Sequence, residues 1–203
     1  MSEPTPSPRP VEQGRGGERL PLPPMDQLNA EQRAAAQALI DGPRKAVYGP
    51  FVPLLRTPAL LDRVAQLGEA LRFGGTLDAR VRELAICVAA REVGNQFEWV
   101  MHRPLAEAAG VAAAALEAVR VAARPEGLKA DEQVAVDVAT ELLQRNGLAD
   151  ATYALAVETF GEAGVVELST LVGYFVMVSW VMNVARTPSR PTADVTPLPS
   201  WPL

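Results

Sequence analysis

The chain has 203 residues, of which 48% are hydrophobic and 21% are charged, and its formal net charge at pH 7 is −5. This composition excludes disorder throughout and is typical of one globular domain with a sizeable core. The acidic balance leaves no basic face for polyphosphate, so we expect no nucleic acid partner.

Cysteine occurs once, at Cys87, which excludes an intrachain disulfide and a multi-thiolate metal site. This usage fits a reducing compartment, and the polar, proline-rich start of the chain lacks the apolar core of a signal peptide. We therefore expect a cytoplasmic protein. Residues 1–24 are predicted to form a flexible arm, residues 25–186 a single all-helical domain, and residues 187–203 a proline-rich tail.

The pattern of caps, apolar spacing and glycines divides the domain into helices. Asn29 begins the first with capping-box spacing to Gln32, and Asp78 is a suitable N-cap further on. Between them, the segment 42–56 contains three prolines and two glycines and is predicted to be a loop lying over an apolar surface. The predicted helices are residues 30–40, 58–73, 79–93, 96–109, 112–122, 130–144, 150–160 and 163–185.

The last predicted helix includes eighteen residues without a formal charge, residues 168–185. That length is at the threshold for a membrane span. Polar side chains interrupt the segment, and no basic cluster flanks it. We therefore expect no membrane partner and interpret it as a helix buried inside a bundle or an oligomer.

Two short sequences repeat a Trp-Val-Met core, "EWVMH" at residues 98–102 and "SWVMN" at residues 179–183. Each follows a Glu-Leu pair at a similar interval. Either chance or a duplicated helical hairpin with one degenerate copy explains this similarity.

The stretch "REVGNQFEWVMH" contains His102, the only histidine of the chain. Glu98 lies four residues earlier, so both side chains share one face of a helix, and such a pair can transfer protons near neutral pH. The alternative is structural: Asn95 and Glu98 also have the spacing of a capping box, in which Glu98 bonds back to the backbone of Asn95. Spacing alone leaves both interpretations open.

The segments "RELAICVAAREVGNQFEWVMHRPLAEAAGV" and "FGEAGVVELSTLVGYFVMVSWVMNVARTP" resemble the carboxymuconolactone decarboxylase family, which includes the alkylhydroperoxidase D peroxidases. The peroxidase motif of a glutamate, two cysteines and a histidine falls on Glu83, Asn95, Glu98 and His102. The resemblance implies an all-α helical bundle that assembles as a homo-oligomer, a trimer or hexamer, with its site between helices near a subunit boundary.

The resemblance departs from the peroxidase branch at both thiol positions, which disfavours peroxide reduction. The closer likeness is to the decarboxylase branch, which lacks the thiol pair. It implies a lyase acting on a small carboxylated lactone or a related acid by acid-base chemistry. His102 would then deliver a proton, Glu98 would orient His102, and Glu83 would hold the second ring proton or a water molecule.

An anionic substrate also needs a cation, and Arg72, Arg82 and Arg91 are candidates, although a surface salt bridge is the simpler role for each. Neither a phosphate-binding glycine loop nor a metal-ligand pattern is present in the sequence, so we expect no cofactor. Further residues that either pack in the core or line the substrate site are Asn95, Trp99 and Tyr174.

Two other functions stay open. The chain could be a non-catalytic oligomeric binding or scaffold protein that keeps the family fold. It could also be a thiol redox protein that uses Cys87, although a cysteine in an apolar helix is typically buried and inert.

Overall fold

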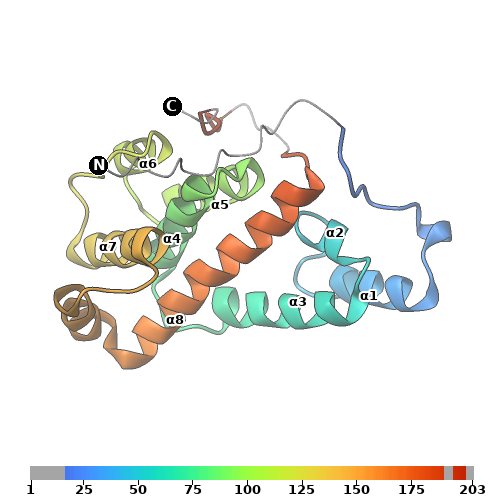
Figure 1. The fold of residues 1–203 in the computed structure, drawn as a ribbon, viewed down its shortest axis with the longest axis horizontal. Helices are drawn as coiled ribbons and strands as arrows, with labels where there is room; N and C mark the ends of the chain where they lie inside the picture. Colours follow the sequence, from blue (N-terminus) through green and yellow to red (C-terminus); the bar gives the residue numbers. More distant parts are fainter. Residues whose placement is uncertain (1–16, 190–193, 200–203) are drawn as a thin grey trace, which may run out of the picture.

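The computed structural model describes residues 17–189 and 194–199, and all of its regular elements are helices (Figure 1). The prediction of an all-α protein is therefore confirmed. In chain order the elements are a 3-10 helix η1 (Met25–Gln27) and the α-helices α1 (Ala30–Asp41), α2 (Phe51–Leu54), α3 (Pro58–Phe73), α4 (Ala79–Glu92), α5 (Gln96–Ala108), α6 (Ala113–Arg120), α7 (Ala130–Arg145) and α8 (Asp150–Ala185).

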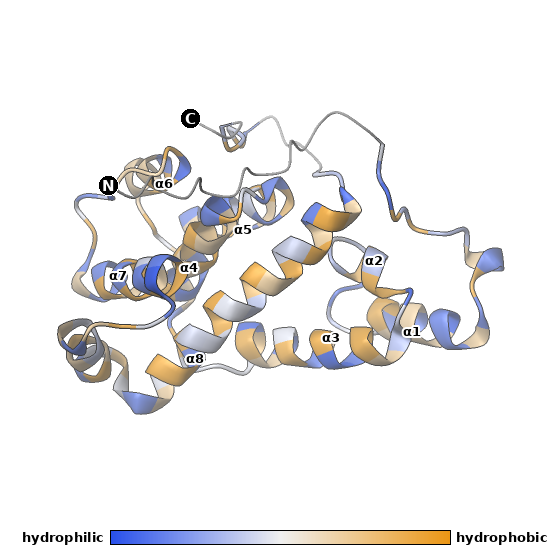
Figure 2. Cartoon of the chain, viewed as in Figure 1, coloured by the Kyte–Doolittle hydropathy of each residue, from blue (hydrophilic) through white to orange (hydrophobic). Residues whose placement is uncertain are grey.

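Helix α8 is the organising element of the bundle and runs diagonally across it (Figure 1). One side packs on α4 and α7, and the other meets α2 and α3. Figure 2 shows α8 as mainly apolar, with hydrophilic residues near its ends. It passes a length and composition test for a membrane span, but half of the tested window is buried inside the protein, as in the core helix of a globular bundle.

The helix starts follow the capping chemistry expected from the sequence. The Asn29 side chain accepts a hydrogen bond from Gln32 N at 2.9 Å, and the Gln32 side chain accepts one from Asn29 N at 3.0 Å. Asp78 caps α4 by accepting a bond from Arg80 N at 2.8 Å. These local bonds satisfy backbone donors that a helix leaves unpaired at its first turn.

The two helices predicted at residues 150–160 and 163–185 are both present within α8, where Gly161, with a φ of +70°, is non-helical and forms a kink between them. The similarity of residues 98–102 to residues 179–183 does not reflect a repeated hairpin. The first copy, with its Glu-Leu pair, spans α4 and α5, whereas the second lies within α8 alone.

The segment 42–56 covers apolar surface, as predicted, and contains the short helix α2. Residues 51–55 are buried in the core. Of the predicted N-terminal arm, residues 17–24 are described: Arg19 N donates to Ala185 O at 2.8 Å. Residues 1–16 and the tail residues 190–193 and 200–203 lie outside the described part.

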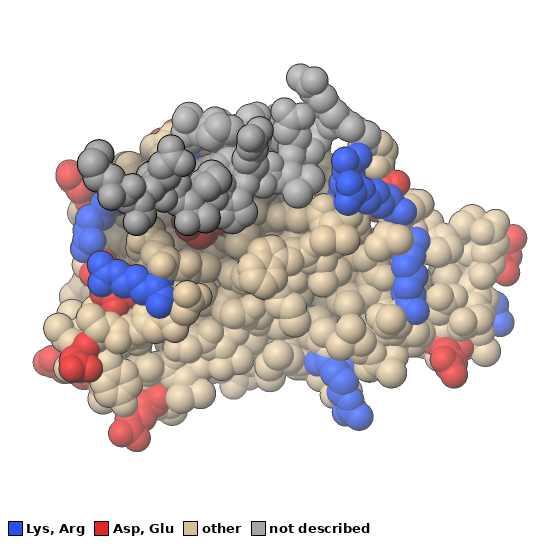
Figure 3. All heavy atoms as spheres, in the orientation of Figure 1, with Lys and Arg blue, Asp and Glu red and all other residues tan. Residues whose placement is uncertain are grey.

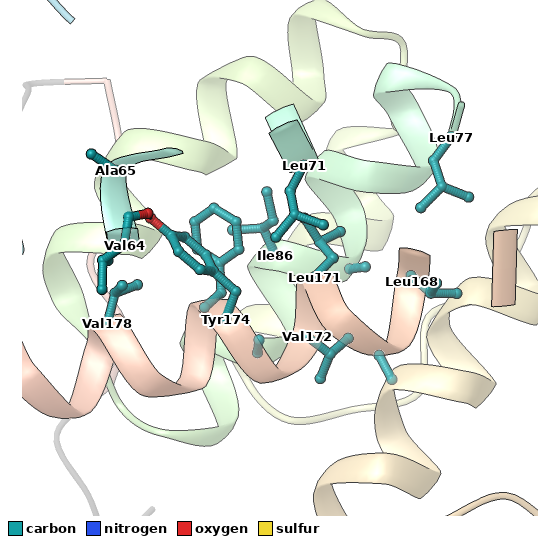
Figure 4. Close-up of a cluster of buried hydrophobic side chains, with 14 of the residues drawn as sticks. Val64, Ala65, Leu71, Leu77, Ile86, Leu168, Leu171, Val172, Tyr174 and Val178 are labelled. Carbon is teal, nitrogen blue, oxygen red and sulfur yellow. The ribbon is translucent and has the colours of Figure 1, made fainter. Parts of the chain in front are cut away.

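A cluster of buried apolar side chains joins α3, α4 and α8 (Figure 4). Tyr174 of α8 points toward α3, and its hydroxyl donates to Val64 O at 3.2 Å. Gly68, one turn further along α3, leaves room for that ring: a Cβ placed there would lie 2.2 Å from the Tyr174 hydroxyl oxygen. The close approach of α3 and α8 therefore depends on a glycine at this position.

We expect Gly68→Ala to lower the free energy of unfolding by about 1–3 kcal/mol, because the methyl group overpacks the contact with Tyr174. Chemical denaturation measures this change. Gly147→Ala is the matched control, since a Cβ at Gly147 meets no described atom within 4 Å; its effect should stay within about 0.5 kcal/mol. Equal stability of the two variants would contradict this packing argument.

Candidate active site

The site is built on a turn that folds α5 back against α4. Helix α4 ends at Glu92, and Gly94 has a φ of +63°, a conformation that favours glycine. Asn95 N then donates to Ala90 O at 2.9 Å, and α5 begins at Gln96. This reversal brings the glutamate of α4 beside the histidine of α5, a placement that spacing alone leaves undetermined.

His102 lies between two carboxylates, one from each helix. Its Nδ1 is 2.6 Å from Glu83 Oε2, and its Nε2 is 3.2 Å from Glu98 Oε2. Each of the three residues exposes 4% of its surface. With a carboxylate at each ring nitrogen, both nitrogens are placed to donate, which is the arrangement of an imidazolium.

His102 and Glu83 shift each other's pKa. Burial alone lowers the pKa of His102, but the hydrogen bonds from its ring to Glu83 and Glu98 outweigh burial and raise the pKa above the ordinary 6.5. Burial has the opposite effect on Glu83 and raises its pKa. The hydrogen bond to His102 and the positive charges of His102, Arg72 and Arg82 outweigh burial, so the pKa of Glu83 lies below the ordinary 4.5.

These opposite shifts define the pH window in which the pair stabilises the fold. The contribution of His102 is complete below pH 6.5 and is lost as pH rises through its raised pKa. The contribution of Glu83 is complete above pH 4.5 and is lost as pH falls through its lowered pKa. Between pH 4.5 and pH 6.5 Glu83 is negatively charged and His102 is positively charged, so the pair stabilises the protein most in this range.

The capping interpretation of Glu98 is only half correct. The Asn95 side chain does cap α5, by accepting a hydrogen bond from Glu98 N at 2.8 Å. The Glu98 carboxylate does not return to the backbone of Asn95, whose N–H is bonded to Ala90 O; it is directed at His102 instead. The cap therefore fixes the backbone of Glu98 and leaves its carboxylate for the histidine.

Asn95 also ties the turn to α8. Its Nδ2 donates to Asn183 Oδ1 at 2.8 Å and to Ser179 O at 3.2 Å, while Asn183 Nδ2 donates to Val93 O at 3.0 Å. Asn95 is 2% exposed. Asn95, a candidate for substrate contact in the sequence, therefore links the turn to α8 and lies outside the cavity lining.

A cavity of about 40 Å³ opens beside Glu98 and His102. Its volume suits a few water molecules. The segment 42–56 covers one side of it, α5 and α8 form other walls, and Arg72 of α3 contributes a cation. The lining residues are Arg44, Tyr48, Pro50, Phe51, Arg72, Phe97, Glu98, Met101, His102, Tyr174, Phe175 and Val178.

The three candidate arginines lie in three different places. Arg72 lines the cavity, and its Nε, which is buried, has no hydrogen-bond partner among the described residues. Arg82 is outside the cavity lining and supports Glu83, with its Nε 3.5 Å from Glu83 Oε1. Arg91 also lies outside the lining and donates from Nε to Arg120 O at 2.8 Å.

The two aromatic candidates, Trp99 and Tyr174, lie in different places. Trp99 is fully buried in a second core cluster, and its Nε1 donates to Thr196 O at 2.9 Å, so it anchors the described part of the C-terminal tail. Tyr174 lines the cavity. Burial raises the pKa of Tyr174 to about 12, so its hydroxyl stays protonated at neutral pH.

Sequence reasoning missed the cavity residues of the covering segment, above all Arg44 and Tyr48. Arg44 is buried, pairs with Glu69 and lies 4.5 Å from the centre of the Phe51 ring. The sequence did contain a signal for these two residues. The segment was predicted to cover apolar surface, and an arginine and a tyrosine in such a segment can face the surface that it covers.

Cys87 is fully buried in α4, and burial raises the pKa of its thiol well above the usual range. It does not line the cavity. Within the described residues, no cluster of three or more histidine, cysteine, aspartate or glutamate side chains is placed to hold a metal ion.

Residues 58–141 match the carboxymuconolactone decarboxylase family, which confirms the resemblance seen in the sequence. No curated protein matches the chain. The matched range contains Glu83, Glu98 and His102 but not α8.

Solved structures share the fold at low sequence identity. An uncharacterized peroxidase-related protein from Ralstonia eutropha, described as an alkylhydroperoxidase AhpD core, has a TM-score of 0.68 at 16% identity over 87% of this chain and 93% of its own. A debrominase in complex with 2,3,4-tribromopyrrole has a TM-score of 0.65 at 10% identity, with the same coverage of 87% and 93%.

A third structure is a protein of unknown function from Agrobacterium tumefaciens, described as a putative antioxidant defence protein AhpD. It has a TM-score of 0.59 at 12% identity over 68% of this chain and 96% of its own. The TM-scores establish the alkylhydroperoxidase D type of fold. Because the sequence identities are low, the reaction has to be argued from the site itself.

Because His102 is the only histidine, its ring nitrogen signals can be assigned without ambiguity by NMR. We expect His102 to titrate above 6.5, and Glu98→Gln to lower that pKa, because one of the two carboxylates stabilising the imidazolium is neutralised. Glu107→Gln, which removes a charge from the exposed side of α5, is the control and should change the titration much less. Titration of the wild type below 6.5 would overturn the assignment.

We expect Cys87 to resist a thiol-specific reagent in the native protein and to react fully once the chain is unfolded in denaturant. Burial and the raised pKa of the thiol both suppress the reactive thiolate. Absorbance of the released reagent group measures the reaction. Rapid modification of the native protein would revive the thiol redox alternative.

Proposed function

We propose, from the match of residues 58–141 to the carboxymuconolactone decarboxylase family, that the chain is a cytoplasmic, cofactor-free lyase that removes CO₂ from a small carboxylated lactone or a related acid. The observation that carries this proposal is His102, which is held between two buried carboxylates at the wall of a cavity that also contains a cation. Acid-base chemistry needs a group of this kind, with its orientation fixed and its pKa displaced.

The roles of the three ionisable residues follow from which of them reach the cavity. Glu98 and His102 line it, whereas Glu83 lies behind the ring and holds the Nδ1 proton. The proton available to a substrate is therefore the one on Nε2, beside the Glu98 carboxylate. Glu83 keeps the ring oriented and favours its charged form.

In the proposed reaction, the bond between the substrate carbon and its carboxylate breaks, and CO₂ leaves. The electron pair remains on the substrate as an enolate, delocalised onto the lactone carbonyl oxygen. His102 then donates its Nε2 proton to the carbon, which forms the new C–H bond and leaves a neutral imidazole. A proton from water restores the imidazolium, so each turnover releases one CO₂ and consumes one proton.

Arg72 is the cation best placed to balance the charge of the substrate. It lines the same cavity, and its buried Nε has no hydrogen-bond partner in the described part of the chain. Arg44 is already paired with Glu69 and bonded to Ala65 O at 3.0 Å, so it is less available. An arginine held in a partly dry site binds a carboxylate or enolate oxygen more strongly than it would in water.

The cavity beside Glu98 and His102 is partly open, and Tyr48 and Phe51 of the covering segment lie on its wall. We expect the substrate to bind against these side chains, which keep water from the enolate and strengthen the charge interactions around it.

A peroxidase activity has no support in this site. The two positions that carry thiols in the peroxidase motif hold Asn95 and Glu98, and both have other bonded roles here. Cys87 is buried outside the cavity.

The test is CO₂ release from a panel of small carboxylated lactones, followed by kinetics on the best substrate. We expect His102→Gln and Glu98→Gln to lower kcat by about 10²–10⁴-fold, because each removes a partner of proton transfer. We expect Arg72→Met to act mainly on KM, raising it about 10–100-fold through the loss of one charge-assisted contact. Arg63→Met, on the exposed side of the same helix, is the matched control and should retain wild-type kinetics.

Circular dichroism establishes that each variant is folded before its kinetics are compared. Unchanged turnover in both His102→Gln and Glu98→Gln would refute the catalytic pair. Failure of the wild-type protein to release CO₂ from any member of the panel would favour the non-catalytic scaffold alternative.

A further inference from the structure

Four charged residues are among those that line the cavity, and their pairing determines which ligand charge the site accepts. On the face shown in Figure 3, charged side chains lie toward the rim and the middle is uncharged. The cavity differs from that surface, because Arg44, Arg72, Glu98 and His102 are all part of its lining. Charges held away from water are costly unless each of them is balanced by a partner.

The cluster around His102 is neutral as a whole. Glu98 lies 3.2 Å from Nε2 of the imidazolium, and Glu83 lies 2.6 Å from its Nδ1. Arg82 Nε is 3.5 Å from the second carboxylate oxygen of Glu83. Two carboxylates therefore meet two cations, which leaves no net charge in this cluster for a ligand to balance.

Arg44 is neutralised by a residue outside the cavity lining. It is buried, its Nη1 pairs with the Glu69 carboxylate of α3, and its Nη2 donates to Ala65 O at 3.0 Å. Its guanidinium carbon also lies 4.5 Å from the centre of the Phe51 ring. A second anion that approached Arg44 would have to displace Glu69 or lie beside it.

Arg72 is the cation that remains. It lines the cavity, and no carboxylate of the described residues forms an ion pair with it. Its guanidinium carbon lies 5.2 Å from the centre of the Phe73 ring, and its buried Nε has no hydrogen-bond partner among the same residues. The site therefore has one unbalanced positive charge, which one carboxylate can balance.

The uncharged part of the lining is largely aromatic. Tyr48 and Phe51 come from the covering segment, Phe97 comes from α5, and Tyr174 and Phe175 come from α8. The Phe175 ring packs edge-on against the histidine ring, with the ring centres 4.9 Å apart. Aromatic side chains pack well against a flat unsaturated ring, but they offer no opposite charge to a second carboxylate.

We propose that the site selects an acid with one carboxylate on a flat apolar ring, and that Glu69 sets this selectivity by neutralising Arg44. The inference rests on the proposed function for the identity of the site and adds the class of acid. The single carboxylate binds Arg72. A second one would be buried beside Arg44 without an available cation, which costs roughly 10–100-fold in affinity. Glu69 is a positioning residue, because it acts through Arg44 and not on the substrate.

Binding of stable probes tests the inference without turnover. Benzoate carries one carboxylate on a flat ring, and isophthalate carries a second carboxylate on the same ring. We expect calorimetry to show that benzoate binds about 10–100-fold more tightly than isophthalate. Shifts of the His102 ring signals in NMR spectra locate the bound benzoate at the cavity. Arg72→Met should lower the affinity for benzoate about 10-fold or more, because the unbalanced cation is lost.

A change at Glu69 should relax the selectivity. Glu69→Gln frees Arg44 for a second carboxylate and should raise the affinity for isophthalate about 10-fold or more, with little change for benzoate. Adding Arg44→Met to that variant should remove the gain. Asp62→Asn, which removes a carboxylate from the exposed side of α3, is the matched control and should bind both probes like the wild type. A merely structural role of Glu69 predicts no tighter binding of either probe.

Three results overturn the inference: isophthalate binding to the wild type as tightly as benzoate, no binding of benzoate at any accessible concentration, or a folded Glu69→Gln variant that binds isophthalate no more tightly. Circular dichroism checks the fold of each variant, and the comparison of probes on the wild type decides alone where Glu69→Gln does not fold. Binding and CO₂ release are separate measurements. A protein that prefers benzoate but releases no CO₂ keeps this inference and loses the proposed reaction.

Discussion

The structure depends on holding a histidine and two carboxylates together out of water. Isolated charges are costly to bury, and removing one partner of such a group leaves the others unpaired. Glu83, Glu98 and His102 offset that cost by bonding to each other, with Arg82 and Arg72 nearby to balance the second negative charge. The same bonds hold the imidazole in one orientation and in its charged form, which is what a proton donor needs.

The rest of the bundle maintains this cluster. The turn at Gly94 sets α5 against α4, and Asn95 fastens that turn to α8 through Asn183 and Ser179 O. The segment 42–56 closes the cavity from the other side. Residues 50 and 51 of this segment line the cavity, while residues 53 and 54 border a groove beside Met177 and Trp180 of α8.

Local signals predicted most of the helices. Asn29, Asp78 and Gly94 act through bonds and dihedral angles within a few residues, so their effect can be inferred from sequence. The failures have a common cause. Burial of Asn95 and Trp99 away from the cavity is decided by partners between 84 and 97 residues away.

The sequence by itself determined the all-helical class, the pairing of Glu98 with His102 on one helical face and the absence of a second thiol, because helical periodicity and residue identity are local properties. Only the tertiary structure decided that Glu83 completes the cluster and that Arg72 rather than Arg82 or Arg91 lines the cavity. It also decided that one edge of α8 is not covered by the described elements. Those outcomes depend on how helices cross and turn, and no spacing within a single helix encodes the position of a side chain on another.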